Sequence, residues 1–221
     1  MIDDLGQHLL RYNFNQKYMV FDFETNALNI ASPNINLPWN LGYNLFEGKK
    51  LIHSKEILLK WPDYKIDKTV ALINGFNQEV YERDAVDPVK PLNRFNNLLN
   101  REDIYLITAN GFSFDMYVNN LALRQLGLAE NFSYLHRLIC IQNLAKAEHL
   151  KIKMPKIGTD DWVAKNMALT NWYDFKFKCS LGVLSKKYEV TYDENKHHKS
   201  SVYDVELTKQ IFDKQIGKIE I

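Results

Sequence analysis

The sequence predicts a single α/β domain in which helices flank a mixed central β-sheet. Three observations support this fold class. An apolar, β-prone run at residues 18–24 is followed by two strand-like segments, which a glycine-containing turn at 47–50 joins into a hairpin. Helical segments and a short apolar strand then alternate, and further helices follow. Because we find no internal repeat and no linker, we expect one domain over residues 1–221, with its core at about 18–215.

The further elements rest on local patterns. Pro91 suits the first turn of a helix, and Leu92, Phe95 and Leu98 lie on one face of that helix. The run at 104–107 is short, apolar and uninterrupted, which is typical of a buried strand. In chain order we expect a short helix within 1–17, strands at 18–24, 39–46 and 51–61, a helix over 67–83 that is interrupted near 73–75, a helix from 91, a strand at 104–107, helices at about 114–126 and 138–150, an irregular segment at 151–179, and helices at 181–188 and 202–216.

The composition is ordinary for a soluble globular protein, with 46% hydrophobic and 25% charged residues. The formal net charge is +1, so any surface that binds nucleic acid must be local. Cys140 and Cys179 are too few for a disulfide framework and lack the spacing of a zinc site. The sequence has no signal-like start and no apolar run near the ~20 residues that span a bilayer. We therefore expect a cytoplasmic protein of bacterial or phage type, with no membrane partner.

Two carboxylates occupy alternate positions at the end of the first strand. Side chains alternate along a strand, so Asp22 and Glu24 share one face, and Phe21 and Phe23 share the other. Like charges this close raise each other's pKa, and partial burial adds a desolvation penalty. A bound divalent cation relieves both effects, and Mg²⁺ and Mn²⁺ prefer oxygen ligands of this kind. The strand therefore predicts a metal site that carboxylates from elsewhere complete.

Two further acids stand out by their context. Asp115 closes the segment 110–115, which follows the buried strand at 104–107. Loops after the C-terminal ends of sheet strands are where the sites of α/β proteins gather. Asp204 lies in the first turn of the last expected helix. The helix dipole favours an acid at either helix start, so a purely structural explanation stays open at this point.

Together these motifs resemble those of the DEDD, or DnaQ-like, 3′→5′ exonuclease superfamily, which has a ribonuclease-H-like fold. The resemblance rests on Asp-x-Glu in the first strand, Asn-x-x-x-Phe-Asp at 110–115, and histidine followed by Asp204 near the end. Residues 73–77 are similar to the family's Ile-x-Gly-Ile-Thr segment, and residues 181–208 to its third exonuclease motif. The resemblance spans roughly 18–215, and it implies a ribonuclease-H-like mixed central sheet flanked by helices.

The resemblance also implies an activity. Such enzymes hydrolyse phosphodiester bonds of DNA from the 3′ end and release nucleoside 5′-monophosphates. Two Mg²⁺ ions, for which Mn²⁺ substitutes, clamp the attacking and leaving oxygens. Asp22 is implied to bridge both ions, and Asp115 to help hold one of them. Glu24 and Asp204 are implied to hold the ion that activates water.

A histidine that deprotonates or orients the attacking water is the implied general base. In the histidine subtype of the family it stands five positions before the last aspartate, and that residue here is Lys199. His198 lies one position further from Asp204, and His197 lies two positions further. The tyrosine subtype is disfavoured because Ser200 occupies its position. A one-residue loop expansion is the simplest account, so we predict His198 as the base and keep His197 as the alternative.

Candidate substrate-binding residues lie next to the predicted carboxylates. The resemblance implies that Thr25, Asn26 and Leu28 contact the 3′-terminal nucleotide, through backbone groups and an apolar wedge. Asn110 could hydrogen-bond to substrate or simply hold its turn. Phe114 could stack on a base or pack in the core. Both interpretations of these two residues stay open.

A variable segment rich in lysine and aromatic residues occupies 151–199. In grooves for single-stranded nucleic acid, lysines meet phosphates and aromatic rings stack on bases. A solvated face above core aromatics accounts for the same composition. Both interpretations stay open for this segment.

We expect the partner to be a nucleic acid with a free 3′ end, with single-stranded DNA favoured. Because we find no polymerase segment, we expect a stand-alone nuclease, or a proofreading subunit acting with a polymerase or replication partner in trans. An exoribonuclease with the same site is the main alternative. A catalytically inactive module that binds single strands is the second, and the presence of all four carboxylates argues against it.

Overall fold

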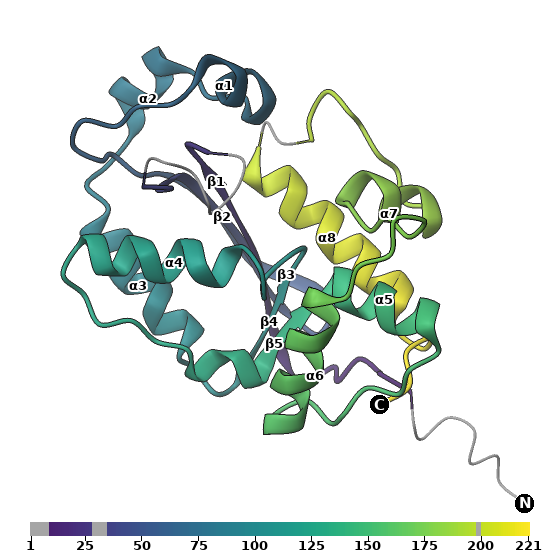
Figure 1. Ribbon diagram of the computed structural model, residues 1–221. Helices are drawn as coiled ribbons and strands as arrows, with labels where there is room; N and C mark the ends of the chain where they lie inside the picture. Colours follow the sequence, from purple (N-terminus) through teal and green to yellow (C-terminus); the bar gives the residue numbers. More distant parts are fainter. Residues whose placement is uncertain (1–8, 28–34, 198–199) are drawn as a thin grey trace, which may run out of the picture.

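A mixed β-sheet forms the centre of the protein (Figure 1). The computed structural model describes residues 9–27, 35–197 and 200–221. The described strands lie in the order β3-β2-β1-β4-β5. β2 runs antiparallel to both β1 and β3, whereas β4 is parallel to β1 and to β5. The strands are β1 (Lys17–Thr25), β2 (Pro38–Glu47), β3 (Lys50–Leu58), β4 (Ile104–Thr108) and β5 (Leu138–Cys140).

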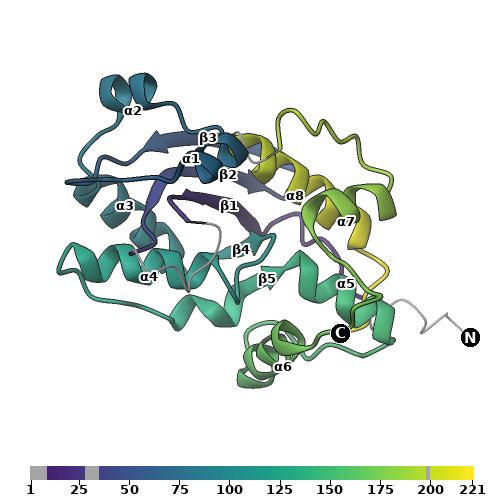
Figure 2. The same ribbon diagram turned by 45° about the horizontal axis from the view of Figure 1, so that its top comes forward.

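Helices cover both faces of this sheet. α3 and α4 lie on one side of it, and α5, α7 and α8 lie on the other (Figures 1 and 2). None of the described helices combines the length with the apolar character that crossing a membrane requires. The helices are α1 (Lys68–Asn74), α2 (Gln78–Asp84), α3 (Val89–Leu99), α4 (Asp115–Gln125), the 3₁₀ helix η2 (Ser133–Arg137), α5 (Ile141–Leu150), α6 (Asp160–Asn171), α7 (Leu181–Lys187) and α8 (Ser201–Gln215).

Strand β1 has a hydrophobic core on each side, which explains its nearly continuous apolar sequence. Val20 belongs to the core that contains residues of α5, α7 and α8, whereas Phe21 belongs to the core that contains residues of α3 and α4. Side chains alternate along the strand, so Asp22 and Glu24 continue the face of Val20. The two carboxylates therefore face the side of the sheet that α8 covers.

Helix α8 approaches the sheet very closely where it begins. Gly42 on β2 pairs with Asp22 on β1. A Cβ atom added to Gly42 would stand 2.3 Å from Ser201 Oγ and 2.8 Å from a backbone carbon of Ser201. The Ser201 hydroxyl also donates a hydrogen bond to Asn40 Oδ1 at 2.7 Å. The missing side chain at Gly42 thus allows the first turn of α8, which carries Asp204, to lie against the strand that carries Asp22.

The expected interruption near residues 73–75 is confirmed. Gly75 has a φ angle of 70°, a left-handed conformation that favours glycine, and it ends α1. Asn77 then caps α2, because its side chain accepts a hydrogen bond from the N–H of Val80 at 3.0 Å. This break leaves Asn74 at the end of α1, where its amide donates to the carbonyl of Thr25 at 2.7 Å. The break at Gly75 thus places Asn74 where its side chain holds the C-terminal end of β1.

Two expectations for the middle of the chain are wrong. The helix expected at 138–150 begins only at Ile141, because residues 138–140 form β5 and pair with β4. Three apolar residues fit a strand or a buried helix, and only the neighbouring strand decides between them. The segment expected to be irregular contains α6. Thr159 caps this helix by accepting from the N–H of Trp162, and two acids stand in its first turn.

The remaining expected elements agree with the structure to within a few residues, except at the N-terminus. Of the short helix expected within 1–17, residues 1–8 lie outside the described part of the chain. Residues 9–17 form no helix, and Leu9 instead makes a β-bridge with Glu220.

We expect Gly42→Ala to destabilise the protein, because the new methyl group would force α8 away from β2. Overpacking of this kind costs about 1–3 kcal/mol, so the free energy of unfolding in urea should fall by that amount. Ser54→Ala, at an exposed position of β3, is the control and should change little. Equal stabilities of the two variants would contradict the close approach.

Candidate active site

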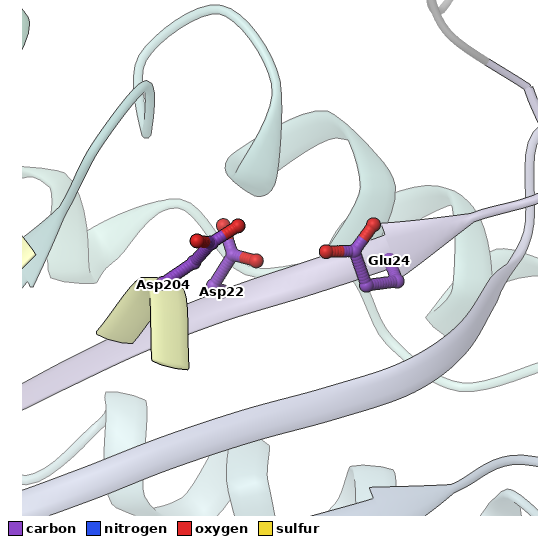
Figure 3. Close-up of side chains that lie close together, drawn as sticks. All are labelled: Asp22, Glu24 and Asp204. Atoms are coloured by element: carbon purple, nitrogen blue, oxygen red, sulfur yellow. The ribbon is translucent and has the colours of Figure 1, made fainter. Parts of the chain in front are cut away.

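Three carboxylates converge at the C-terminal end of β1. Asp22 and Glu24 come from the strand, and Asp204 comes from the first turn of α8 (Figure 3). Each residue offers an oxygen, and these oxygens all lie within 4.8 Å of one another. Glu24 and Asp204 are buried, and Asp22 is half-buried. The sheet thus brings together acids that are about 180 residues apart in the sequence.

The fourth predicted acid, Asp115, begins α4 and is 2% exposed. Its carboxylate is close enough to raise the pKa of both Asp22 and Glu24. Burial raises the pKa of Asp115 itself to about 7, against backbone hydrogen bonds from Asp115 and Phe23 that lower it. Its Oδ1 atom is buried and has no hydrogen-bond partner among the described residues. Asp115 therefore belongs to the same electrostatic cluster as the three converging acids.

Burial is the largest cause of the raised pKa values in this cluster. It raises the pKa of Asp22 and of Glu24 well above the usual range. Neighbouring negative charges add to the rise: Asp115, Glu24 and Asp204 act on Asp22, and Asp204, Asp115 and Glu56 act on Glu24. No described lysine or arginine forms a salt bridge with Asp22, Glu24 or Asp115. Positive charge near these carboxylates would stabilise their ionised forms.

The donor set fits a divalent cation. Hard cations such as Mg²⁺ and Mn²⁺ prefer carboxylate oxygens, and the cluster offers only oxygen ligands. The unpartnered Oδ1 of Asp115 and the raised pKa values of Asp22 and Glu24 are what a missing positive charge would leave behind. A bound cation could therefore relieve the repulsion between the carboxylates and give the Oδ1 atom of Asp115 a partner.

A cleft of about 370 Å³ opens over the carboxylates. It is wide enough for a small ligand, since typical ligand sites have volumes of about 300–1,000 Å³. Its walls come from the end of β1, the end of α1, the loop after β4, and residues at or near the starts of α5, α7 and α8. The lining residues are Asp22, Phe23, Glu24, Thr25, Ala27, Ile73, Asn74, Ala109, Asn110, Phe114, Gln142, Ser180, Leu181, His197 and Asp204.

Of the two candidate histidines, His197 lines this cleft. Its Nδ1 atom lies 2.8 Å from Oδ1 of Asp204. Its ring also contacts Tyr192 edge-on, with centroids 5.4 Å apart. His198, which the sequence analysis favours as the base, lies outside the described residues. The alternative histidine is thus the one whose place in the cleft is described.

Residues after β1 are held by their own hydrogen bonds. The Asn26 side chain donates to the carbonyls of Ile35 and Lys65 and accepts from the N–H of Leu37. Thr25 donates its hydroxyl to the carbonyl of Ala27 at 2.7 Å. These two side chains hold the turn, and the predicted contact of Thr25 and Asn26 with the 3′-terminal nucleotide stays a prediction. Leu28, the predicted apolar wedge, lies outside the described residues.

Asn110 and Phe114 both line the cleft, as the sequence analysis expects of substrate-binding residues. The side-chain oxygen of Asn110 accepts a hydrogen bond from the Ser113 hydroxyl, so it also holds its turn. Phe114 is only partly buried and packs at the edge of the core, whereas Phe112 is fully buried. The loop after β4 thus divides its aromatic residues between core and cleft.

Sequence reasoning missed several cleft residues. Asn74 fixes the carbonyl of Thr25, and its position inside a family-like segment was a signal that could have found it. Leu181 likewise begins the segment that is similar to the third exonuclease motif, whereas Gln142 and Ser180 carry no such signal and reach the cleft only through the folding of the chain. Their roles follow from topology rather than from any local pattern.

No family model matches the sequence. The chain is 24% identical over 198 residues to the PolC-type DNA polymerase III of Ureaplasma parvum serovar 3. That match covers 90% of this chain and 11% of the polymerase.

Solved structures with a similar fold include exonuclease I, with a TM-score of 0.66, 14% sequence identity, and coverage of 90% of this chain and 40% of that one. Exonuclease I from E. coli in complex with a dT13 oligonucleotide has a TM-score of 0.66 at 15% identity, and the complex with dA16 has 0.64 at 15%. Both complexes cover 90% of this chain and 40% of the other.

These comparisons confirm the predicted fold class: the chain has a ribonuclease-H-like fold, with a mixed sheet flanked by helices. The structural likeness and the polymerase match support the resemblance to the DnaQ-like superfamily. The chain spans 40% of exonuclease I and 11% of the polymerase, so the activities of those whole proteins remain proposals here.

We expect the protein without metal to lose stability as the pH rises from about 4 to 7. An ordinary aspartate gives up its proton near pH 4 in the unfolded chain, whereas Asp115 in the folded protein keeps it up to about pH 7. The folded state therefore binds more protons in this window, and the free energy of unfolding falls with pH. Thermal unfolding in EDTA across this range measures the slope.

Asp115→Asn should reduce that slope, because it removes one of the buried carboxyl groups whose pKa is raised. Asp161→Asn is the matched control, since Asp161 also stands in the first turn of a helix but is exposed. If Asp115→Asn and wild type lost stability equally between pH 4 and 7, the assigned pKa would be wrong.

Proposed function

We propose that this protein is a metal-dependent 3′→5′ exonuclease that acts on DNA. The observation that carries the proposal is the convergence of Asp22, Glu24 and Asp204 in a cleft, with Asp115 beside them, in a fold like that of exonuclease I. In the proposed reaction, water attacks the phosphorus of the last phosphodiester bond and the 3′ oxygen of the preceding nucleotide leaves. The product is a nucleoside 5′-monophosphate.

Mg²⁺ is the proposed cofactor, as two ions, with Mn²⁺ as a substitute. When bound, the ions supply Lewis-acid stabilisation of phosphoryl charge and lower the pKa of a bound water. Glu24 and Asp204 would hold one ion together with Asp22. Asp115 would hold the other, again with Asp22, whose pKa all three of the other acids raise. The carboxylates otherwise serve to place this charge at the floor of the cleft.

The 3′-terminal nucleotide is the proposed occupant of the cleft. We propose that backbone groups of Thr25 and Asn26, with Leu28 as an apolar wedge, position its sugar and base. Asn110 and Phe114 line the cleft from the loop after β4 and would complete this contact. Asn74 would act as a positioning residue, because it fixes the Thr25 carbonyl rather than the substrate.

Single-stranded DNA is the proposed substrate. Its support is that exonuclease I, which has a similar fold, has been solved with dT13 and dA16. The match to a PolC-type polymerase supports a role beside a polymerase or replication partner in trans. The cytoplasm is the proposed compartment, because replication intermediates with free 3′ ends arise there in bacteria.

Digestion of end-labelled oligonucleotides tests the function. We expect 5′-labelled single-stranded DNA to shorten from its 3′ end in Mg²⁺ or Mn²⁺, with release of nucleoside 5′-monophosphates, and EDTA to stop the reaction. Matched double-stranded DNA and RNA substrates measure strandedness and sugar preference. Faster digestion of RNA than of DNA would replace the proposed substrate with RNA.

Asp22→Ala should abolish this release while raising thermal stability in EDTA, because it removes a metal ligand and also a source of repulsion. Glu102→Gln, an exposed acid outside the cleft, is the control and should keep full activity. Metal-dependent release by Asp22→Ala at the wild-type rate would refute the proposed metal site.

A histidine is the proposed base. Its spacing before Asp204 favours His198, whereas its position in the cleft favours His197. Loss of a general base lowers kcat by about 10²–10⁴-fold. We expect one of the single variants His197→Ala and His198→Ala to show this loss in Mg²⁺, and the other to stay close to wild type. Near-wild-type rates for both variants would exclude a histidine base.

A further inference from the structure

The segment 172–180, between α6 and α7, carries two unusually exposed aromatic side chains. Tyr173 is 84% exposed and Phe175 is 70% exposed, more than any other aromatic residue in the described part of the chain. Large apolar groups that face water together usually mark a binding surface. Exposure alternates along the segment, since Trp172 and Asp174 are partly buried. The two exposed rings thus stand two residues apart in the segment.

This segment is held rigidly at its base. The rings of His149 and Phe177 stack with centroids 4.4 Å apart, and Trp172 lies 5.7 Å from Phe177. The Lys146 ammonium group donates hydrogen bonds to the carbonyls of Leu169, Thr170 and Trp172 at the end of α6. These contacts bury Trp172 and Phe177 in part, and they leave Tyr173 and Phe175 without a role in the core.

The turn itself is also fixed by hydrogen bonds. The Asp174 side chain accepts from the N–H of Lys176 at 2.8 Å, and its carbonyl accepts from the N–H of Phe177 at 3.1 Å. This arrangement uses the Asp174 carboxylate inside the turn. Phe175 is thus presented to solvent by an ordered turn.

The segment runs directly into the candidate active site. Ser180 and Leu181 line the cleft, and the Cys179 thiol lies 3.9 Å from Oε1 of Gln142, another cleft residue. Five residues span at most about 17 Å of chain, so Phe175 lies within that distance of the cleft wall at Ser180. A strand whose end occupies the cleft could reach both rings.

The charge of the segment complements a nucleic-acid strand. Lys176 Nζ lies 5.5 Å from the centre of the Phe175 ring, and Lys178 is exposed. Asp174 is the only acid at 172–180, and the turn engages it. Cations next to exposed rings are what phosphates and bases require together.

We propose that Tyr173 and Phe175 form a stacking platform for bases upstream of the 3′-terminal nucleotide, with Lys176 and Lys178 meeting the phosphates. This inference rests on the proposed function, because it assumes that a single strand enters the cleft by its 3′ end. Aromatic faces stack on every base, so the platform would grip strands without reading their sequence. It would set how tightly the enzyme holds a strand, and leave the hydrolytic step to the carboxylates.

The test compares wild type with the double variant Tyr173→Ala/Phe175→Ala. Binding of fluorescent oligothymidylates of increasing length is measured by anisotropy in EDTA, where no hydrolysis occurs. Stacking contributes about 1–3 kcal/mol per base, so affinity for long strands should fall by at least about tenfold. Wild-type affinity should rise with strand length beyond the first few nucleotides, and the double variant should lose that rise. KM for long strands should rise with kcat unchanged.

Three controls separate the platform from a general effect. Phe14→Ala removes a ring that is 68% exposed and lies before the opposite end of β1, and should bind like wild type. Tyr173→Phe/Phe175→Tyr keeps an aromatic ring at both positions and should bind long strands with wild-type affinity. Lys176→Gln/Lys178→Gln should reduce the slope of log K against log salt by up to about 1.4, since each single-strand phosphate contact contributes about 0.7.

Hydrolysis of the p-nitrophenyl ester of thymidine 5′-monophosphate distinguishes the role of the platform from the activity of the cleft. This small substrate fills only the cleft, so the double variant should hydrolyse it at the wild-type rate. If the double variant binds long strands within twofold of wild type, the platform is refuted and the proposed function stands. If wild type binds strands through these rings but releases no nucleotide with Mg²⁺ or Mn²⁺, the proposed function fails and the platform stands. Wild type that neither binds nor cleaves refutes both.

Discussion

The fold must hold four carboxylates close together at a partly buried site. Burial and mutual repulsion both disfavour their ionised forms, and both raise the pKa values of Asp22 and Glu24. Such a cluster works against folding, so the elements that carry it must be stable without it. Packing elsewhere provides this stability. β1 lies between two hydrophobic cores, and α8 packs directly against β2. The apolar part of the fold thus keeps the acids close enough together to bind a cation.

The sheet topology determines which side chains can meet at this site. Because β1 lies between the antiparallel β2 and the parallel β4, its C-terminal end is flanked by a hairpin on one side and by the start of α4 on the other. Asp115 enters from the loop after β4, as sites at the carboxyl ends of parallel strands usually do. Asp204 enters from α8 instead, and only the absence of a side chain at Gly42 allows that approach. One small residue on β2 therefore helps to bring Asp204 to the other acids.

How much could be predicted from the sequence depended on how local each signal was. β1, the hairpin and the break at Gly75 follow from alternation, turn residues and helix caps, which act within a few residues. β5 was missed because its three residues become a strand only by pairing with β4. The four acids were predictable from their motifs, whereas Gln142 and Ser180 reach the cleft through long-range packing. For the proposed base, the sequence leaves two adjacent histidines open, because spacing in a loop does not fix which side chain faces the cleft.

The predicted metal ligands and the proposed stacking platform stand on different kinds of structure in this molecule. The carboxylates stand on a central strand and on helix starts, in a fold that is similar to that of exonuclease I at 14% sequence identity. The exposed rings of Tyr173 and Phe175 stand on a surface segment, where substitution costs little stability. A surface segment can therefore change its aromatic residues and lysines without disturbing the acids, whereas the acids cannot move without the sheet. A change of strand preference would thus leave the frame that holds the acids unchanged, and for that reason likeness of fold does not by itself determine the substrate.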